Sequence, residues 1–211
     1  HDQKLNPMSF LRSEEFLNIL TECCIKDYPY TPFADAFHTM RSMLLPVLYL
    51  MGSEVPKADV YHAICTGYGG LLACLGGHVY KKKVLLTEHG IYTREREEEI
   101  IRAKWVQPAF KKQWISFFYM LSDIIYTRAF LVSALFTNAM HAQIQMGCDK
   151  GKCRVIENGI NYERLSPIPL KEEDGWVDIG AIVRLAPIKD IKTMIYSFSI
   201  VKQERPDALL Y

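Results

Sequence analysis

The sequence has almost no excess charge of either sign. Its 211 residues include 25 Lys and Arg against 24 Asp and Glu, which gives a formal net charge of +1. A chain with so little net charge has no broad basic surface for a nucleic-acid backbone or an anionic membrane. We therefore expect no nucleic-acid partner, and any anion that the protein binds must be held by a few local residues.

Cysteine is scarce, and its spacing favours neither a disulfide framework nor a metal site. Cys23 and Cys24 are adjacent in a helix-like stretch, so their side chains diverge. Cys148 and Cys153 form a C-x₄-C pair without the second ligand pair that a zinc site needs. We interpret these two residues as buried or free thiols, and we expect no metal and no other cofactor.

Long hydrophobic runs are also missing. The longest, 43–51, contains Pro46 and is far shorter than the ~20 residues that cross a bilayer. No signal peptide opens the chain, so we expect a cytoplasmic protein, at most peripheral to the inner membrane through partners. The chain begins with His1 rather than Met, and 208–211 reads as the start of a strand. We therefore expect an internal fragment of a longer protein.

The composition is that of an ordinary globular protein, with 49% hydrophobic and 23% charged residues. The spacing of the apolar residues predicts helices and strands. Apolar spacing predicts a helix that begins after Ser13 and ends before Pro29, and a second from residue 33 with a kink at Pro46. The order that follows is strand 59–64, a glycine turn, helix 68–80 and strand 84–88. Strand, helix and strand within thirty residues are typical of a parallel α/β sheet.

The remaining elements continue this order. The glycine pair Gly76 and Gly77 is expected near the end of helix 68–80. Later elements are a helix 94–103 capped by Thr93, a long helix from residue 108, strand 131–135, a helix capped by Thr137 and ended by Gly147, and strand 154–157. Residues 1–157 thus form a first α/β domain, 158–175 a connection, and 176–211 the start of a second, with strand 177–183, helix 190–202 and a strand from 208.

Two segments carry side chains suited to chemistry. Glu88, His89, Gly90 and Arg94 lie at or just after the end of a predicted strand, where parallel sheets bind ligands, and His62 lies in the strand before it. An H-E-x-x-H pattern is absent, so a metal site is not indicated. From its spacing alone, His89 could equally serve as a general base or hydrogen-bond to the backbone.

In the second unit, Arg184 leaves a strand and Lys189 comes just before a helix N-terminus. Two cations beside helix N–H groups make a compact site for a diphosphate, although a solvated Arg and Lys flanking a loop is the alternative. The glycines at 67–70 have the spacing G-x-G-G rather than G-x-G-x-x-G, which disfavours a dinucleotide-binding dehydrogenase.

Read together, four segments resemble the Pel exopolysaccharide glycosyltransferase (PelF) branch of glycosyltransferase family 4. They are ADVYHA at 58–63, LLTEHGIYTRER at 85–96, VIENGI at 155–160 and RLAPIKDIKT at 184–193. The second is distinctive for that branch, whereas the last two are shared across family 4. The resemblance implies a GT-B fold of two Rossmann-like parallel-sheet domains, both incomplete in this chain.

The resemblance also implies an activity. It is that of a retaining hexosyltransferase, which moves a sugar, glucose from UDP-glucose in that branch, to a growing exopolysaccharide without a metal. Arg184 and Lys189 match the family's donor-diphosphate pair, and His89 matches a catalytic histidine close to the donor sugar. Asn158 and Gly159 match the turn that leaves the first domain, on the donor side. His62, Glu88, Gly90 and Arg94 are further candidates for the cleft.

Partners and alternatives follow from the same match. The partners implied are a nucleotide-sugar donor, a polysaccharide acceptor and inner-membrane secretion proteins. The family's glycine loop would precede His1 and its acidic motif would follow Tyr211, so we expect this fragment alone to be inactive. Two alternatives remain: a non-catalytic family member that binds a nucleotide or a partner, and a glucosyltransferase like glycogen or starch synthase.

Overall fold

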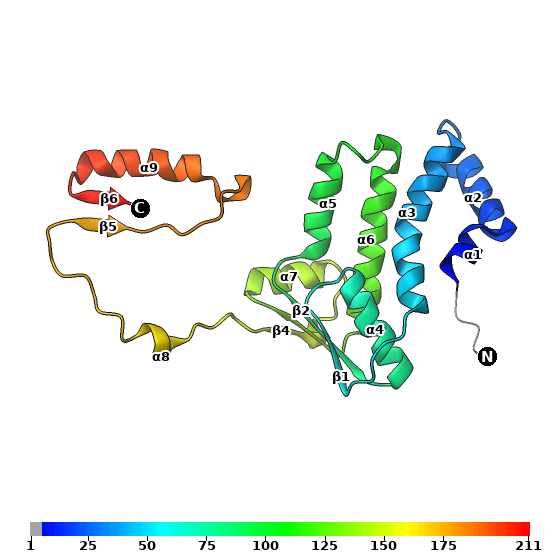
Figure 1. Ribbon diagram of the computed structural model, residues 1–211, viewed down its shortest axis with the longest axis horizontal. Helices are drawn as coiled ribbons and strands as arrows, with labels where there is room; N and C mark the ends of the chain where they lie inside the picture. Colours follow the sequence, from blue (N-terminus) through cyan, green and yellow to red (C-terminus); the bar gives the residue numbers. More distant parts are fainter. Residues whose placement is uncertain (1–5) are drawn as a thin grey trace. The chain divides into compact units, whose positions relative to one another are not determined.

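The computed structural model describes residues 6–211 and divides the chain into two units (Figure 1). The first unit ends at Gly159 and the second comprises Ile160–Tyr211. Each is a mixed α/β structure with parallel strands, as the sequence predicts. Each unit is described by itself below.

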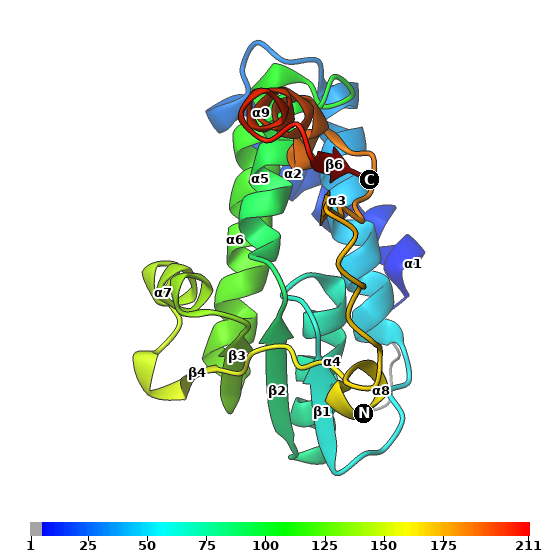
Figure 2. The same ribbon diagram turned by 90° about the vertical axis from the view of Figure 1, so that its left-hand side faces the viewer.

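The first unit is built on a sheet of four parallel strands. They are β1 (Val60–Ala63), β2 (Lys83–Glu88), β3 (Leu131–Ala134) and β4 (Cys153–Val155), and their spatial order is the order of the chain. Figure 2 shows them side by side. Residue pairs such as His62 with Leu85, and Thr87 with Ser133, set the register. All four strands therefore end at one edge of the sheet, where the residues that follow them come together.

Seven α-helices and the 3₁₀ turn η1 (Lys150–Lys152) accompany this sheet in the described part of the first unit. The α-helices are α1 (Pro7–Leu11), α2 (Glu14–Asp27), α3 (Phe33–Gly52), α4 (Tyr68–Tyr80), α5 (Tyr92–Arg102), α6 (Pro108–Arg128) and α7 (Thr137–Gln145). Helix α6 joins two hydrophobic clusters: Phe117 and Phe118 pack with α1–α3, and Ile125 packs with the sheet and α4. Helix α6 is deeply packed, because one face of it is buried along its length.

Several predicted helix ends are confirmed and two are wrong. Ser13 caps α2 by accepting a hydrogen bond of 3.2 Å from the Phe16 N–H, and Gly147, at φ +99°, directly follows the C-cap of α7. Thr93 and Thr137 are not caps. Both lie inside the first turn of their helices, and the Thr93 hydroxyl bonds to Ser122 of α6 instead. A tertiary hydrogen bond thus replaces the expected local one.

The glycine pair Gly76 and Gly77 lies near the C-terminal end of α4, which spans Tyr68–Tyr80 as predicted. The helix continues to Tyr80, and Lys81 adopts the left-handed conformation at its C-cap. A Cβ on Gly76 would collide with the Tyr61 ring, and one on Gly77 with Val84. The glycines therefore serve the close packing of helix on sheet.

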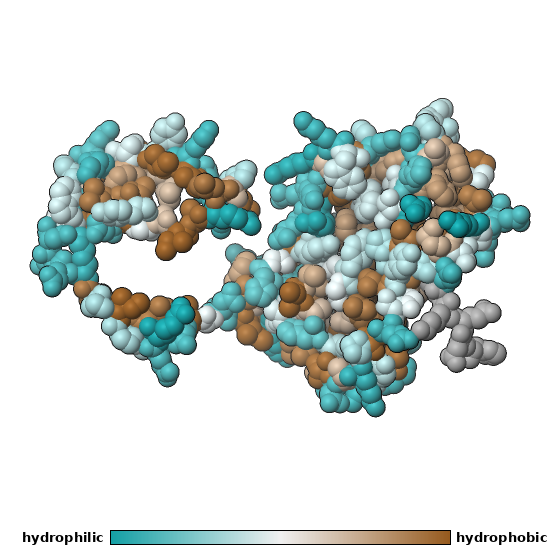
Figure 3. All heavy atoms as spheres, viewed as in Figure 1, coloured by the Kyte–Doolittle hydropathy of each residue, from teal (hydrophilic) through white to brown (hydrophobic). Residues whose placement is uncertain are grey.

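The second unit is a small βαβ structure. It contains α8 (Tyr162–Leu165), β5 (Val177–Ile179), the 3₁₀ turn η2 (Pro187–Lys189), α9 (Ile191–Glu204) and β6 (Ala208–Leu210), with β5 and β6 parallel. Strand β5 is shorter than the predicted 177–183. Ala208 is the one buried residue of this unit, and apolar side chains such as Ile182 and Leu185 are exposed. Figure 3 shows hydrophobic atoms on the surface of this unit in brown. This unit thus leaves apolar surface open.

No helix within residues 6–211 is both long enough and apolar enough to span a membrane.

Candidate functional site

The first candidate site is the edge of the sheet where β2 ends. His89 follows the strand directly and its side chain is exposed. Gly90 comes next, and a Cβ there would meet the carboxylate of Glu95. Arg94 is exposed in the first turn of α5. The fold therefore gathers three of the predicted residues within one short segment, with His89 and Arg94 open to solvent.

His62 lies in β1 and belongs to a chain of polar side chains that crosses the sheet. Its Nε2 lies 2.8 Å from Thr87 Oγ1 in β2, and Thr87 Oγ1 lies 2.8 Å from Ser133 Oγ in β3. The three side chains stand on one face of adjacent strands. His62 is thus held by a hydroxyl while the rest of its ring stays exposed.

Glu88, the last residue of β2, is buried and only 1% exposed. The Tyr126 hydroxyl of α6 donates a hydrogen bond of 2.7 Å to Glu88 Oε2, and the Gln143 Nε2 of α7 donates one of 3.0 Å to the same oxygen. Glu88 Oε1 is also buried but accepts no hydrogen bond. The carboxyl therefore faces α6 and α7 and does not line the exposed surface beside His89.

These surroundings raise the pKa values of both Glu88 and Tyr126. Burial raises the pKa of the Glu88 carboxyl above its ordinary value, and the hydrogen bonds from Tyr126 and Gln143 offset only part of that rise. Burial together with the nearby Glu88 raises the pKa of Tyr126 as well. Both groups are thereby shifted toward their protonated, uncharged forms.

A second buried polar group lies at the same end of the sheet. The Ser122 hydroxyl of α6 donates a hydrogen bond of 2.8 Å to Thr66, in the loop after β1, and it also bonds to Thr93 of α5. All three side chains are at most 1% exposed. The hydroxyls thus connect the β1 loop, α5 and α6 around the position where the chain leaves β2.

The second candidate site is the loop between β5 and α9, in the second unit. Arg184 and Lys189 are both exposed there. Asp190, at φ +41°, caps α9: its carboxylate accepts hydrogen bonds from the backbone N–H of Thr193, at 3.4 Å, and from its hydroxyl, at 2.7 Å. Beside these residues is a hollow of about 460 Å³, lined by Leu185, Ala186, Pro187, Asp190, Ile191 and Lys192. The loop therefore combines a concave apolar surface with nearby cations.

The predicted donor-side turn, Asn158 and Gly159, lies at the end of the first unit. Both residues are exposed, and nothing would contact a Cβ placed on Gly159. The turn has room for a ligand but shows no contact that would select one. Its role stays a prediction.

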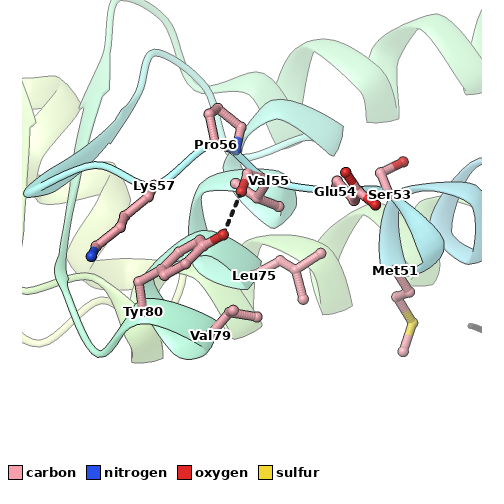
Figure 4. Close-up of a pocket in the computed structure, with 9 residues that line it drawn as sticks. All are labelled: Met51, Ser53, Glu54, Val55, Pro56, Lys57, Leu75, Val79 and Tyr80. Atoms are coloured by element: carbon pink, nitrogen blue, oxygen red, sulfur yellow. Dashed lines mark hydrogen bonds between the residues drawn. The ribbon is translucent and has the colours of Figure 1, made fainter. Parts of the chain in front are cut away.

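Another hollow, of about 590 Å³, lies away from these residues (Figure 4). It is formed by the end of α3, by the link that leads to β1 and by α4, and the Tyr80 hydroxyl donates a hydrogen bond of 3.0 Å to the Val55 carbonyl at its wall. This hollow is near the start of β1, whereas ligands of α/β sheets bind beyond the strands' carboxyl ends. None of the predicted site residues lines it.

Within residues 6–211, no group of three or more His, Cys, Asp or Glu side chains could hold a metal ion. Cys148 and Cys153 are buried free thiols, with the Cys153 Sγ 3.4 Å from the Cys148 Sγ. This confirms their interpretation from the sequence.

Sequence reasoning missed the buried partners of Glu88, namely Tyr126 and Gln143. The available signal was a polar residue on the otherwise apolar face of a helix. Such residues are buried only with a partner, but the sequence does not say which one.

Comparison with known proteins places most of the chain in a family whose function is unknown. Residues 1–151 match the family model described as a domain of unknown function (DUF3492). No curated protein matches the chain.

Proposed function

We propose, from the premise that the chain belongs to the DUF3492 family, that it acts in a retaining glycosyltransferase of the GT-B type. The reaction is transfer of a hexose, glucose from UDP-glucose, to a growing exopolysaccharide. The proposal rests on the resemblance of four segments to the Pel branch of glycosyltransferase family 4. It is supported by two α/β units with parallel strands, each carrying predicted site residues beyond the end of a strand.

One observation carries most weight, the loop between β5 and α9. Arg184 and Lys189 stand in this loop, next to a hollow of about 460 Å³ and just before a capped helix N-terminus. Asp190 already accepts the Thr193 N–H, so a bound anion would be met by the guanidinium, the ammonium and the remaining N–H groups of the first turn. A diphosphate is the ligand that this combination suits best, and the apolar lining suits the rest of a nucleotide.

The chemistry of transfer requires such a site. Breaking the bond between sugar and phosphate leaves negative charge on the departing diphosphate, while the sugar becomes an oxocarbenium-like cation. Fixed positive charges stabilise the departing group in the transition state more than in the ground state, and so accelerate the reaction. We assign this role to Arg184 and Lys189.

His89 takes a different role in the proposal. It is exposed directly after β2, and its immediate neighbour Gly90 has no side chain. The Glu95 carboxylate fills the space that a side chain on Gly90 would take, so a substrate would meet this segment at the exposed His89 side chain. We assign His89 to the sugar rather than to the nucleotide.

The His89→Ala variant of the full-length protein tests this division of roles. We expect it to reduce glucose transfer from UDP-glucose strongly while leaving the affinity for UDP close to that of the wild type. Calorimetric titration with UDP measures the second quantity. A large loss of UDP affinity would contradict the assignment of His89 to the sugar. Binding of UDP without any transfer by the wild type would favour a non-catalytic nucleotide-binding role instead.

A further inference from the structure

The environment of Glu88 is unusual for a carboxylate. Tyr126 and Gln143 both donate to Oε2, at 2.7 and 3.0 Å, while Oε1 is buried and accepts no hydrogen bond. An ionised carboxylate has two equivalent acceptor oxygens, and leaving one of them dry and unpaired is costly. A neutral carboxylic acid carries no charge, so burying Oε1 without a partner costs less in the acid than in the carboxylate, and the observed pattern favours the acid.

The charges around Glu88 agree with this assignment. No Lys, Arg or His forms an ion pair with Glu88 in the described part of the chain. The titratable groups that face it are Tyr126 from α6 and, near Tyr126, the thiols of Cys148 and Cys153 at β4. From α7 it meets the neutral amide of Gln143, from the β1 loop the hydroxyl of Thr66, and from α5 the backbone N–H of Tyr92. A negative charge here would have no cation to balance it.

The position of Glu88 gives the buried acid a role. The next residue in the chain is the exposed His89, and α5 begins three residues later at Tyr92. The carboxyl therefore fixes the last residue before His89 to α6 and α7, on the side of the sheet away from solvent. The hydroxyls of Thr66, Ser122 and Thr93 fix the β1 loop and the first turn of α5 in the same way.

We propose that Glu88 is a positioning residue, whose buried carboxylic acid, in its neutral form, ties the segment 89–91 to α6 and α7 and so holds His89 at the edge of the sheet. The proposal rests on the proposed function only in giving His89 a ligand to meet. The hydrogen bonds of Glu88 form without a bound nucleotide sugar, and their effect on residues 89–92 can be measured without one.

Three variants of the chain separate the possibilities. Glu88→Gln keeps the shape and replaces the acid hydroxyl with an amide donor that cannot ionise. Glu88→Ala removes the tie. Glu22→Gln, on the exposed surface of α2, makes the same chemical change where nothing is buried and serves as the control.

The first measurement is urea unfolding at pH 5, 6 and 7. An acid that is neutral in the folded state but ionised in the unfolded state destabilises the fold increasingly as pH rises above the ordinary carboxyl value, until its own raised pKa is reached. The unfolding equilibrium constant of the wild type should therefore grow relative to that of Glu88→Gln, by up to about tenfold per pH unit. Identical pH dependence in the two proteins would overturn the proposal. The Glu22→Gln control should follow the wild type.

The second measurement is amide hydrogen exchange at pH 6. We expect the peptide that covers residues 89–92 to exchange at the wild-type rate in Glu88→Gln and at least tenfold faster in Glu88→Ala, with the strands of the sheet little changed. Uniform acceleration, or none in 89–92, would show that Glu88 does not position this segment. If Glu88→Ala does not fold, Tyr126→Phe, which deletes one donor to Oε2, replaces it. Tyr126→Phe should accelerate the same peptide, and its failure to do so would equally overturn the proposal.

Discussion

Neighbouring residues at the end of β2 have opposite surroundings. Glu88 is buried against two helices and His89 is exposed, because successive side chains of a strand point to opposite faces of the sheet and the chain turns away just after it. A polar side chain is thus anchored on one side of the backbone while its neighbour remains free to meet a ligand. Rigid support for an exposed group is what precise placement of a reactive side chain requires.

The charges of the β5–α9 loop should matter for turnover. In the full-length protein, we expect Arg184→Ala or Lys189→Ala to lower the rate of sugar transfer by about a hundredfold or more, because each removes charge that stabilises the departing diphosphate. Both side chains are exposed, so the fold should be unaffected. Steady-state kinetics with UDP-glucose gives the rates, and Lys26→Ala, on the exposed face of α2, is the control. Wild-type turnover in both variants would refute the diphosphate site.

The buried thiols should be unreactive. Burial, with the hydrogen-bonded thiol of Cys153, raises the pKa of Cys148 to about 12, and only the thiolate is nucleophilic. At pH 8 we expect iodoacetamide to modify the exposed Cys23 quickly and to leave Cys148 intact until the chain is unfolded in urea. Mass spectrometry of the digested protein gives the order of modification. Labelling of Cys148 in the native protein at the rate of Cys23 would contradict its placement.

At the scale of elements, the glycines of α4 differ in what a Cβ at each position would contact. We expect Gly76→Ala to cost about 1 to 3 kcal/mol of unfolding free energy, because its Cβ would press on the Tyr61 ring. That ring cannot move aside easily: the Tyr61 hydroxyl donates a hydrogen bond of 2.7 Å to the Pro56 carbonyl.

Gly69→Ala in the same helix is the matched control. Its Cβ would lie 3.8 Å from the Cys65 Sγ, an ordinary contact, and alanine is the better helix former. We expect it to be neutral or to stabilise by about 0.5 kcal/mol. Urea denaturation of both variants makes the comparison, and equal effects would argue against close packing of α4 on the sheet.

The elements also show how far sequence reasoning reaches. Periodic apolar spacing and strong local signals predict the order of strands and helices, and Ser13 and Gly147 act as expected. The caps predicted at Thr93 and Thr137 are wrong, and the Thr93 hydroxyl meets Ser122, which is 29 residues away in the chain. Rules based on neighbouring residues fail at positions where contacts with other elements determine what a side chain bonds to.

The candidate site shows the same division. The positions of His89, Arg184 and Lys189 beyond strand ends follow from the alternation of strand and helix, and the structure places them so. The burial of Glu88 does not follow, since a charged residue at a strand end usually faces water. Glu88 is buried because Tyr126 of α6 and Gln143 of α7 pack against it and donate hydrogen bonds to it.

At the scale of the whole molecule, an exposed segment lies in the second unit, close along the chain to its boundary with the first. Between α8 and β5, residues 166–176 form neither helix nor strand, and all of them are exposed. We expect limited digestion with trypsin to cut first at Arg164 or Lys171, and to leave a fragment of the first unit that resists further cleavage. Electrophoresis and mass spectrometry identify the first cut. Initial cleavage within α5, which carries Arg94 and Arg96, would contradict the stability ascribed to the first unit.

The most direct test of the proposed donor site is an NMR titration of the isotope-labelled chain with UDP-glucose, which detects binding even at a Kd of about 1 mM. We predict saturable shifts of the backbone amides in 184–191, apart from Pro187, which has none, and the loss of these shifts in the Lys189→Ala variant. Binding should be weak, because the site uses few residues of this chain. Amides in this loop that stay unmoved at saturating UDP-glucose, in a chain whose spectrum is that of a folded protein, would contradict the account.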